Sequence, residues 1–451
     1  MEYRAPKGTA DMLGETARAW EYLLRTAQDL FARYGYEPIY TPLFEHTEVF
    51  ARGIGEATDI VGKEMYTFLD KGERSITLRP EGTASVVRAA LENNLTSNGR
   101  GAKVYYAGPM FRYERPQKGR MRQFWQIGAE ALNMAEPSAD AEMIVMLMAF
   151  FSRIGIPSEN MRLLVNSMGD ENCRPAYREH VADYVRGHAQ HLCEECNRRA
   201  DTNPLRAFDC KNPGCREVMA SAPLLRDALC DECAAHYSKV KQSLDALGVS
   251  YTEDPKLVRG LDYYTRTVFE VQADAGLGSQ NAIGGGGRYD RLMETYGGAP
   301  TPGLGFALGF ERCLLALRAA GVEVPSPPIA QVFVAAVDDS MAGHAFRITA
   351  RLRDAGIATE MDHQARSLKS QFKQADRLGA QRVVVVGPDE ITAGQVTVRD
   401  MVSREEQAVP IEALAASLGA ELSIAAYAAS AAPPSAVAGA PGANTGSPAT
   451  P

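Results

Sequence analysis

The chain has 451 residues and a formal net charge of −8, with 45% hydrophobic and 23% charged residues. These values are typical of a soluble globular protein with two or three domains. The longest apolar run, Met143–Phe151, is too short to span a bilayer, and the N-terminus lacks the apolar region of a secretion signal. We therefore expect a cytoplasmic protein without a membrane segment. The negative charge argues against a nucleic-acid partner unless basic groups gather in local patches.

The N-terminal region is predicted to be a helix followed by a strand. Apolar side chains keep helical spacing from Thr16 to Tyr34, and Gly35 ends the helix. Residues 37–42 have the sequence EPIYTP and are predicted to be extended, because two prolines exclude a helix.

A short strand from Ser75 to Pro80 is predicted to lead into a second helix, which runs to about Leu95. Glu81, Gly82 and Thr83 stand at the start of this helix. A carboxylate and a hydroxyl at a helix start usually cap its free N–H groups.

Residues 104–131 are predicted to form two strands joined by a long turn. Pro109–Glu114 leads outward and Arg122–Glu130 returns, with polar and aromatic side chains sharing strand faces at a spacing of two. The turn contains a proline, a glycine and a concentration of cations. By itself this is either a surface hairpin with a charged tip or a device that holds phosphates beside a small polar molecule.

The middle of the chain is predicted to be helical and is rich in cysteine. Ser138–Gly155 is an apolar core helix, and residues 172–257 carry helical pattern and two CxxC pairs. The pairs are Cys193/Cys196 and Cys230/Cys233, with Cys210 and Cys215 between them. Paired CxxC motifs fit tetrahedral zinc, but the gap between the pairs exceeds the ~15–20 residues usual for a zinc ribbon. A structural zinc at these four cysteines and metal-free thiols are the two alternatives.

Three segments in the second half combine glycine, arginine and aromatic residues: LVRGLDYYTRTVFE at 257–270, AIGGGGRYD at 282–290 and GLGFALGFER at 303–312. The first could be a turn entering an aromatic core strand, although Arg, Asp and two phenols are costly to bury without a ligand. Neither glycine-rich segment is a P-loop or a dinucleotide fingerprint. A strand with Gly303 and Gly305 on one face could accept a flat base, and the helix after it could attract phosphates.

The C-terminal part follows a proline linker at 324–328 and alternates strand and helix. Strands are predicted at Gln331–Val337, Ile357–Met361, Arg382–Val386 and Gln395–Val402, which favours a largely parallel sheet. A set of cations at helical spacing shares one helix face: Arg366, Lys369, Lys373 and Arg377. Residues 422–451 are mostly Ala, Pro, Gly and Ser and are predicted to be a disordered tail.

The hairpin resembles motif 2 of the class II aminoacyl-tRNA synthetases, a strand with Phe-Arg-x-Glu, a variable loop and a returning strand. TLRPEGT at 77–83 and the three glycine- and arginine-containing segments resemble, in order, those of the histidyl-tRNA synthetase family. The helix and strand before residue 42 resemble motif 1, which implies a homodimer. The resemblance implies an α+β fold: an antiparallel-sheet catalytic domain at 1–325 with a helical insertion at 172–257, and an α/β anticodon-binding domain at 329–421.

The resemblance also implies an activity, which is attachment of L-histidine to tRNA(His) with ATP and Mg²⁺. Histidine's carboxylate would attack the α-phosphorus of ATP, and the ribose of the tRNA would then attack the adenylate. Histidine would contact Glu81, Gly82, Thr83, Arg112, Gln126, Glu130, Arg259, Tyr263 and Tyr264, with Glu130 and Tyr264 binding the imidazole. ATP would contact Arg112, Glu114, Arg120 and Arg312, with Arg112 and Arg259 as the catalytic pair at the α-phosphate. The tRNA acceptor end would contact Arg115 and Gln117, and the cationic helix face would contact the anticodon stem.

Two rival interpretations fit parts of the sequence. A non-catalytic regulatory relative would keep the fold but lose the phosphate-binding arginines and the C-terminal domain, and both are present. A zinc-bearing nucleic-acid-binding protein would explain the cysteines but leaves RGLDYY unexplained. A catalytic zinc is not expected, because the segments that carry the chemistry lie outside the cysteine-rich region.

Overall fold

The computed structural model describes residues 3–55, 58–273, 281–325 and 329–422. The described chain forms two compact units, one within Met1–Val324 and one within Pro325–Pro451. The predicted tail lies outside the described residues except for Leu422, and so do linker residues 326–328. No helix in the described ranges is long and apolar enough to cross a membrane.

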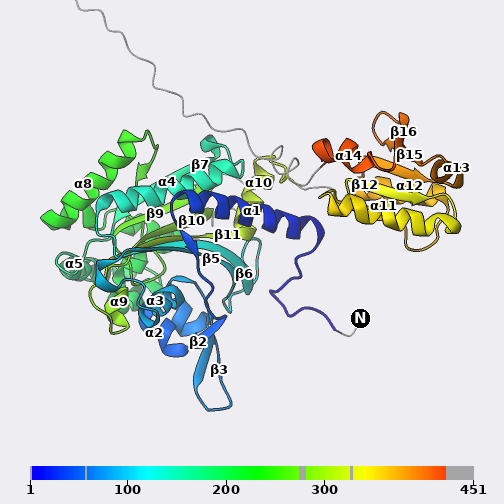
Figure 1. The fold of residues 1–451 in the computed structure, drawn as a ribbon. Coiled ribbons are helices and arrows are strands. Elements are labelled where there is room, and N and C mark those ends of the chain that lie inside the picture. The colour runs from blue at the N-terminus through cyan, green and yellow to red at the C-terminus, as the bar shows by residue number, and fades with distance from the viewer. Residues whose placement is uncertain (1–2, 56–57, 274–280, 326–328, 423–451) are drawn as a thin grey trace, which may run out of the picture. The chain divides into compact units, whose positions relative to one another are not determined.

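The first unit is built around an eight-stranded sheet (Figure 1) with the strand order β1-β5-β6-β11-β10-β9-β7-β8. The six central strands are antiparallel to their neighbours, whereas the two short edge strands pair in parallel. The strands are β1 (Glu37–Pro38), β5 (Ala102–Phe111), β6 (Gln123–Leu132), β7 (Met161–Ser167), β8 (Thr252–Glu253), β9 (Thr265–Ala273), β10 (Ala282–Arg288) and β11 (Gly303–Gly309). Of the predicted 37–42 strand, Glu37 and Pro38 pair with β5, and the N–H of Ile39 donates to the Tyr105 carbonyl at 2.8 Å.

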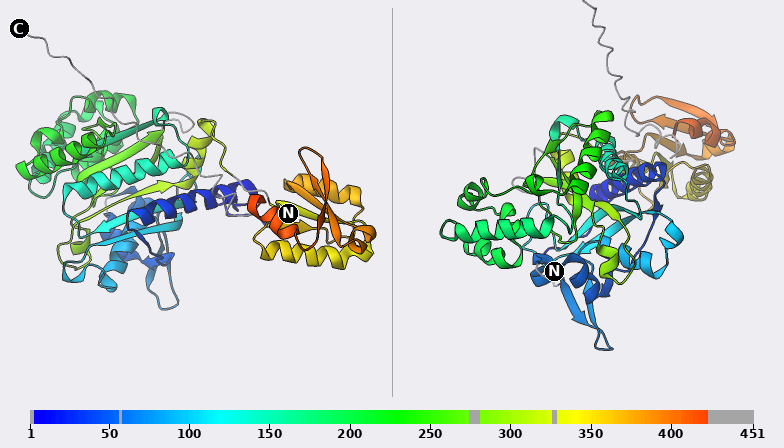
Figure 2. Two further views of the ribbon diagram at one scale, coloured as in Figure 1. Left: turned by 45° about the horizontal axis from the view of Figure 1, so that its top comes forward. Right: turned by 90° about the vertical axis from the view of Figure 1, so that its left-hand side faces the viewer.

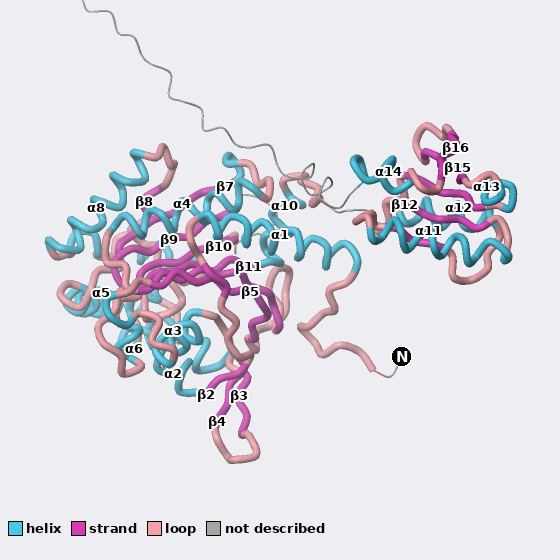
Figure 3. Tube along the Cα trace, viewed as in Figure 1, coloured by secondary structure: helices cyan, strands magenta, loops and turns pink. Residues whose placement is uncertain are grey.

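One face of this sheet is covered by helices that form the main apolar core (Figures 1 and 3). The helices are α1 (Gly14–Arg33), α4 (Pro137–Arg153), α8 (Asp231–Ala246) and α10 (Phe310–Ala319). On β6, Ile127 and Ala129 belong to this core. Because successive side chains point to opposite faces, Gln126 and Glu130 point to the other side of the sheet. The predicted alternation of the returning strand therefore places polar groups opposite the core.

The other side of the sheet carries smaller elements, and Figures 1 and 2 show them opposite α1 and α4. They are the sheet of β2 (Phe44–His46), β3 (Tyr66–Leu69) and β4 (Ser75–Leu78), with α2 (Thr47–Ile54), the π-helical turn η1 (Ile60–Glu64), α3 (Thr83–Glu92) and α9 (Leu292–Thr295). β4 and α3 correspond to the strand and helix predicted around Glu81.

The cysteine-rich insertion contributes α5 (Arg174–Gly187), α6 (Glu194–Thr202), α7 (Pro213–Met219) and α8. It shares its packing with the sheet, since Val240 and Leu244 of α8 lie in the main core and β8 pairs with β7. A second core beneath the insertion extends to Tyr264 and Val268 of the RGLDYY region.

The second unit is a five-stranded sheet with the order β13-β12-β14-β15-β16. Its elements are β12 (Val332–Ala336), α11 (Ala342–Asp354), β13 (Thr359–Met361), α12 (Leu368–Leu378), β14 (Arg382–Val386), α13 (Pro388–Thr392), β15 (Gln395–Asp400), β16 (Glu406–Pro410) and α14 (Leu414–Leu422). The first three predicted strands, β12, β13 and β14, pair in parallel as predicted, whereas β14–β15 and β15–β16 are antiparallel. The connection from β14 to β15 is too short for the crossover of about a dozen residues that a parallel pair needs.

Candidate active site

The β5–β6 hairpin positions the predicted phosphate-binding groups at the end of the sheet. The two strands pair without interruption from Ala102–Leu132 to Phe111–Gln123. The outgoing strand ends at Phe111 instead of Glu114, because the backbone N–H of Tyr113 donates to the carbonyl of Glu64 at 2.6 Å and draws the chain away. Arg112 therefore stands just past the strand end.

A cavity of about 300 Å³ lies over this end of the sheet, at the lower end of the size range of small-molecule sites. It collects predicted residues from distant parts of the chain: Glu81, Thr83, Arg112, Glu114, Arg120, Gln126, Arg259, Tyr263, Tyr264 and Arg312. The predicted contacts Gly82, Arg115, Gln117 and Glu130 are not part of its lining. Arg115 and Gln117 are exposed on the hairpin loop.

Each arginine of the cavity is anchored by the surrounding protein. The Arg112 Nε donates to the Pro80 carbonyl at 2.9 Å, and its guanidinium lies over the Phe124 ring. Arg120 pairs with Glu114 at 2.5 Å, and Arg259 pairs with its neighbour Glu270 at the same distance.

Arg312 completes the set, since its Nη1 donates to the Ala282 carbonyl at 2.9 Å. Burial, and next the nearby Arg120 cation, lower the pKa of Arg312. Four guanidinium groups around one cavity favour an anion with several charges.

The end of the cavity near α3 is formed by hydrogen-bond acceptors. The Glu81 carboxylate accepts the backbone N–H groups of Thr83 and Ala84, both at 2.8 Å, so the predicted capping is present. Glu81 and Thr83 also border the cavity. The buried Gln126 Oε1 has no hydrogen-bond partner among the described residues, which is the state expected of an acceptor that meets a ligand.

Gly82 has a packing role in this arrangement. A Cβ on Gly82 would lie 2.3 Å from the ring of Tyr106, and one on Gly128 would lie equally close to it. Two glycines thus make room for a buried aromatic ring between α3 and the sheet. Gly82 does not line the cavity.

Glu130 is fully buried behind the cavity wall. Its carboxylate accepts the hydroxyl of Thr83 at 2.6 Å and the hydroxyl of Tyr289 at 2.5 Å. Burial raises the pKa of Glu130 to about 8. The carboxyl group is therefore poised to gain or lose a proton near neutral pH.

The glycines of β10 and β11 allow side chains to lie flat against the sheet. A Cβ on Gly285 would lie 3.0 Å from Arg259 Nη1, and one on Gly287 would lie 2.9 Å from the Tyr264 ring. The expectation of a flat base over Gly303 and Gly305 is wrong. The ring of Tyr289 covers Gly303 and the carboxylate of Glu130 covers Gly305.

Several residues of the site were missed from the sequence. Tyr289 stood in the glycine-rich segment as a neighbour of Arg288, and nothing local marked its hydroxyl as a partner of Glu130. Arg79, inside TLRPEGT, is buried and joins two segments by donating to the carbonyls of Pro109 and Thr41 at 3.0 and 3.2 Å. Glu64 lies next to Glu114, and burial followed by that charge raises the pKa of Glu64 to about 7.

The predicted grouping of the two CxxC pairs into one site is wrong. The structure forms two separate clusters, each with four side chains whose ligand atoms lie within 4.8 Å of one another. We name them the tetracysteine cluster (Cys193, Cys196, Cys210 and Cys215) and the aspartate–tricysteine cluster (Asp170, Cys173, Cys230 and Cys233). The pairing failed because Cys210-x4-Cys215 and Asp170-x2-Cys173 were not recognised as the partners of the CxxC motifs.

The cationic helix face of the second unit is present in reduced form. Lys369, Lys373 and Arg377 are exposed on α12. Arg366 precedes the helix and pairs with Asp362 at 3.3 Å, so it does not belong to the face.

The antiparallel sheet, the motif 2 hairpin and an arginine-lined cavity define a class II aminoacyl-tRNA synthetase. A family model described as histidyl-tRNA synthetase matches residues 8–313, and one described as an anticodon binding domain matches residues 331–421. The histidine–tRNA ligase of Pelotomaculum thermopropionicum is 49% identical over 407 residues, 90% of this chain and 95% of the relative. That of Anaeromyxobacter dehalogenans is 50% identical over 416 residues, 92% of this chain and 99% of the relative.

Among solved structures, apo histidyl-tRNA synthetase from S. aureus superposes with a TM-score of 0.78 at 38% identity, covering 92% of this chain and all of that one. The chain belongs to the histidyl-tRNA synthetase family. It is accordingly an aminoacyl-tRNA synthetase that joins histidine to its tRNA at the expense of ATP.

Proposed function

We propose that the cavity over the β5–β6 hairpin is where histidine and ATP react to form histidyl-adenylate. The observation that carries this is the meeting of Arg112, Arg120, Arg259 and Arg312, from distant segments, around one cavity that also contains acceptors for an ammonium group. Histidine's carboxylate attacks the α-phosphorus and pyrophosphate leaves in line. No side-chain nucleophile is required.

In this proposal the histidine ammonium lies between Glu81, Thr83 and Gln126. Its three N–H donors match three acceptors, and Gln126 brings an oxygen that otherwise has no partner among the described residues. The carboxylate then faces Arg112 and Arg259. Both cations stabilise charge as it develops at the α-phosphate, which is the catalytic role we assign to them.

Tyr264 and Glu130 distinguish histidine by its imidazole ring. The two hydroxyls that Glu130 now binds use about half of a carboxylate's acceptor positions. A ring N–H can therefore be added, or it can replace the Tyr289 hydroxyl. Tyr263 supports the pocket, since its ring lies 4.7 Å from that of Tyr264 and its hydroxyl reaches Glu81 at 3.5 Å.

ATP is placed by the remaining groups of the cavity. Arg120 and Arg312 hold the outer phosphates, while Glu114 accepts from the base. Mg²⁺ typically binds through one or two carboxylates together with substrate phosphates. Glu270 borders the cavity and fits that role. The metal would neutralise phosphate charge and orient the leaving pyrophosphate.

The tRNA meets both units of the chain. The exposed Arg115 and Gln117 on the hairpin loop contact the acceptor end, whose ribose attacks the adenylate. Lys369, Lys373 and Arg377 contact phosphates of the anticodon stem, because cations on one helix face bind a backbone without reading its sequence.

A cytoplasmic homodimer is the form in which we propose that the enzyme works. Exposed apolar side chains lie between β1 and the first residue of β2: Tyr40 is 82%, Leu43 45% and Phe44 55% exposed. Such groups favour burial against a second copy. Light scattering on the full chain should give twice its mass of 48.9 kDa, and a monomer mass would remove the dimer from the proposal.

We also propose that the metal of the cysteine-rich insertion is structural zinc.

The test of the reaction site is Arg259→Lys. Lysine keeps the charge and a donor for Glu270 but loses the planar fork, so the fold should persist. We expect histidine-dependent ATP–pyrophosphate exchange to fall about 100-fold or more. The matched control is Arg162→Lys, at an exposed position on β7, the strand that pairs with β9. Equal exchange in both variants would refute the assignment of Arg259.

A further inference from the structure

The two side-chain clusters of the insertion have the composition and spacing of zinc knuckles. The tetracysteine cluster combines Cys193-x2-Cys196 with Cys210-x4-Cys215, and both spacings lie in the x2–x4 range of tetrahedral zinc sites. The aspartate–tricysteine cluster combines Asp170-x2-Cys173 with Cys230-x2-Cys233. Seven of the eight cysteines of the chain fall in these clusters, and the eighth is Cys313 on α10.

The distances within the clusters match those around a tetrahedral ion. Zn–S bonds of about 2.3 Å place two sulfurs roughly 3.8 Å apart. The Sγ atoms of Cys193 and Cys210 are 3.8 Å apart. In the other cluster, the Asp170 Oδ1 lies 3.7 Å from the Sγ atoms of both Cys173 and Cys230. The Cys193–Cys210 separation is too long for a disulfide bond, whose sulfurs lie about 2.05 Å apart. All three separations suit ligands that share one ion.

Backbone groups around both clusters are arranged for thiolates. The N–H of Cys193 donates to the Cys215 Sγ at 3.1 Å, and the N–H of Asp170 donates to the Cys173 Sγ at 3.4 Å. Gly169 has a φ of +62°, and a Cβ there would lie 2.7 Å from the Cys173 Sγ. Such contacts orient metal ligands and stabilise their charge. We propose that the chain binds two zinc ions, one at each cluster.

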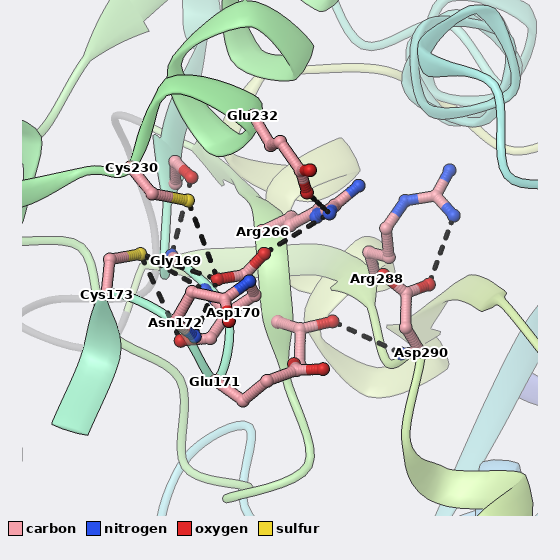
Figure 4. A network of polar contacts seen from close by, with 12 residues as sticks. Gly169, Asp170, Glu171, Asn172, Cys173, Cys230, Glu232, Arg266, Arg288 and Asp290 are labelled. Atoms are coloured by element: carbon pink, nitrogen blue, oxygen red, sulfur yellow. Dashed lines mark hydrogen bonds and ion pairs between the residues drawn. The ribbon is translucent and has the colours of Figure 1, made fainter. Parts of the chain in front are cut away.

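The aspartate–tricysteine cluster is also hydrogen-bonded to the segment that carries Tyr264. Figure 4 shows the contact between Asp170 and Arg266. The second oxygen of Asp170 accepts from Arg266 Nη2 at 3.2 Å. The backbone N–H of Arg266 donates to the Gly169 carbonyl at 2.7 Å, and Arg174, next to Cys173, donates to the carbonyl of Tyr264 at 2.5 Å.

Arg266 has a φ of +48°, a conformation that non-glycine residues rarely adopt. The surroundings must hold it there. The ion at the aspartate–tricysteine cluster therefore positions residues 264–266, and through them the histidine pocket. This second part rests on the proposed role of Tyr264, whereas the binding of two ions does not.

The first measurement is the zinc content of the full chain purified without chelator. We expect two equivalents, released together with the cluster thiols when a mercurial reagent is titrated into the wild-type protein. Less than about a tenth of an equivalent would overturn the proposal, and a single equivalent would overturn the second ion. Iron in place of zinc would overturn it as well.

Matched variants separate the two sites. Cys193 and Cys230 are the N-cap residues of α6 and α8, and serine is a favourable N-cap, so Cys193→Ser and Cys230→Ser should keep both helices. Each variant should retain one equivalent of zinc, whereas Cys313→Ser should retain two. Two equivalents in either N-cap variant would contradict the assignment of ligands.

The positioning role is tested by the KM for histidine in pyrophosphate exchange. Cys230→Ser should raise it about tenfold or more and leave the KM for ATP within about twofold, whereas Cys193→Ser should change neither. Equal histidine KM values in the two variants would overturn the positioning role and leave the zinc count standing. Loss of exchange in a wild-type protein that holds two ions would instead count against the proposed reaction site.

Discussion

Replacing Glu130 by glutamine tests the electrostatics of the histidine pocket. The carboxyl group is fully buried, binds the hydroxyls of Thr83 and Tyr289, and has a pKa raised to about 8 by burial. Alanine would leave both hydroxyls without their acceptor, at about 1–3 kcal/mol each, so it would disturb the fold together with the pocket. Glutamine keeps the volume and an acceptor oxygen, and it resembles the protonated acid.

The size of the effect follows from the pKa. The folded chain holds the proton up to about pH 8, whereas the unfolded chain releases it near the reference value of 4.5. The unfolded state therefore binds fewer protons between these values, and folding stability falls as pH rises through that window. At about 1.4 kcal/mol per pKa unit, the loss is on the order of 4–5 kcal/mol once pH exceeds 8. Glu130→Gln should lack this loss.

The assay is urea unfolding of both proteins at a series of pH values from 5 to about 9. The stability of Glu130→Gln relative to the wild type should increase steadily with pH. Histidine-dependent exchange by the variant, relative to that of the wild type, should fall as pH rises. Above pH 8, where the Glu130 carboxylate is charged, a hydrogen bond to it contributes about 1.5–3 kcal/mol, so the KM for histidine should rise roughly 10–150-fold in the variant.

Glu311→Gln is the matched control, because Glu311 is another carboxyl group at the same cavity and binds the backbone N–H of Trp125. Its side-chain amide can still accept that bond, so the KM for histidine should stay near the wild-type value. The reasoning would be refuted if the stability difference between wild type and Glu130→Gln were independent of pH. An unchanged KM for histidine would refute the contact with the ring.

Two further predictions concern other parts of the chain. Gly305→Ala would place a Cβ 1.7 Å from the Glu130 carboxylate, and overpacking of this kind costs about 1–3 kcal/mol, so the melting temperature should fall. Gly343→Ala, with nothing within 4 Å of its Cβ, should not lower it, and equal melting temperatures of the two variants would contradict the packing. Combined alanine substitution of Lys369, Lys373 and Arg377 should raise the KM for tRNA and flatten its salt dependence while pyrophosphate exchange stays the same. An unaltered KM for tRNA would exclude that face from tRNA binding.

The sequence carried the local features of the site and not its long-range contacts. Period-two alternation on β6 correctly placed Gln126 and Glu130 on one strand face, and the capping pattern correctly placed Glu81 at the start of α3. The sequence could not indicate that the Tyr289 hydroxyl would donate to the Glu130 carboxylate, because the two residues are 159 positions apart.

The cysteines illustrate the same limit. Spacing marked each CxxC as half of a metal site, but the partner half depends on which turns the fold brings together. An aspartate in the role of a fourth ligand has no sequence signature of its own. The structure was needed to show that Asp170 lies beside Cys173 and Cys230. Likewise, the early end of β5 follows from a bond to Glu64 that no local pattern encodes.

The central claim is that one cavity combines the arginine cluster with a pocket for histidine. Pyrophosphate exchange on the full chain with each of the twenty amino acids in turn measures this directly. Histidine alone should support exchange, and substitution of Arg259 by lysine should abolish most of it. Comparable exchange with a second amino acid, or none with histidine, would contradict the account.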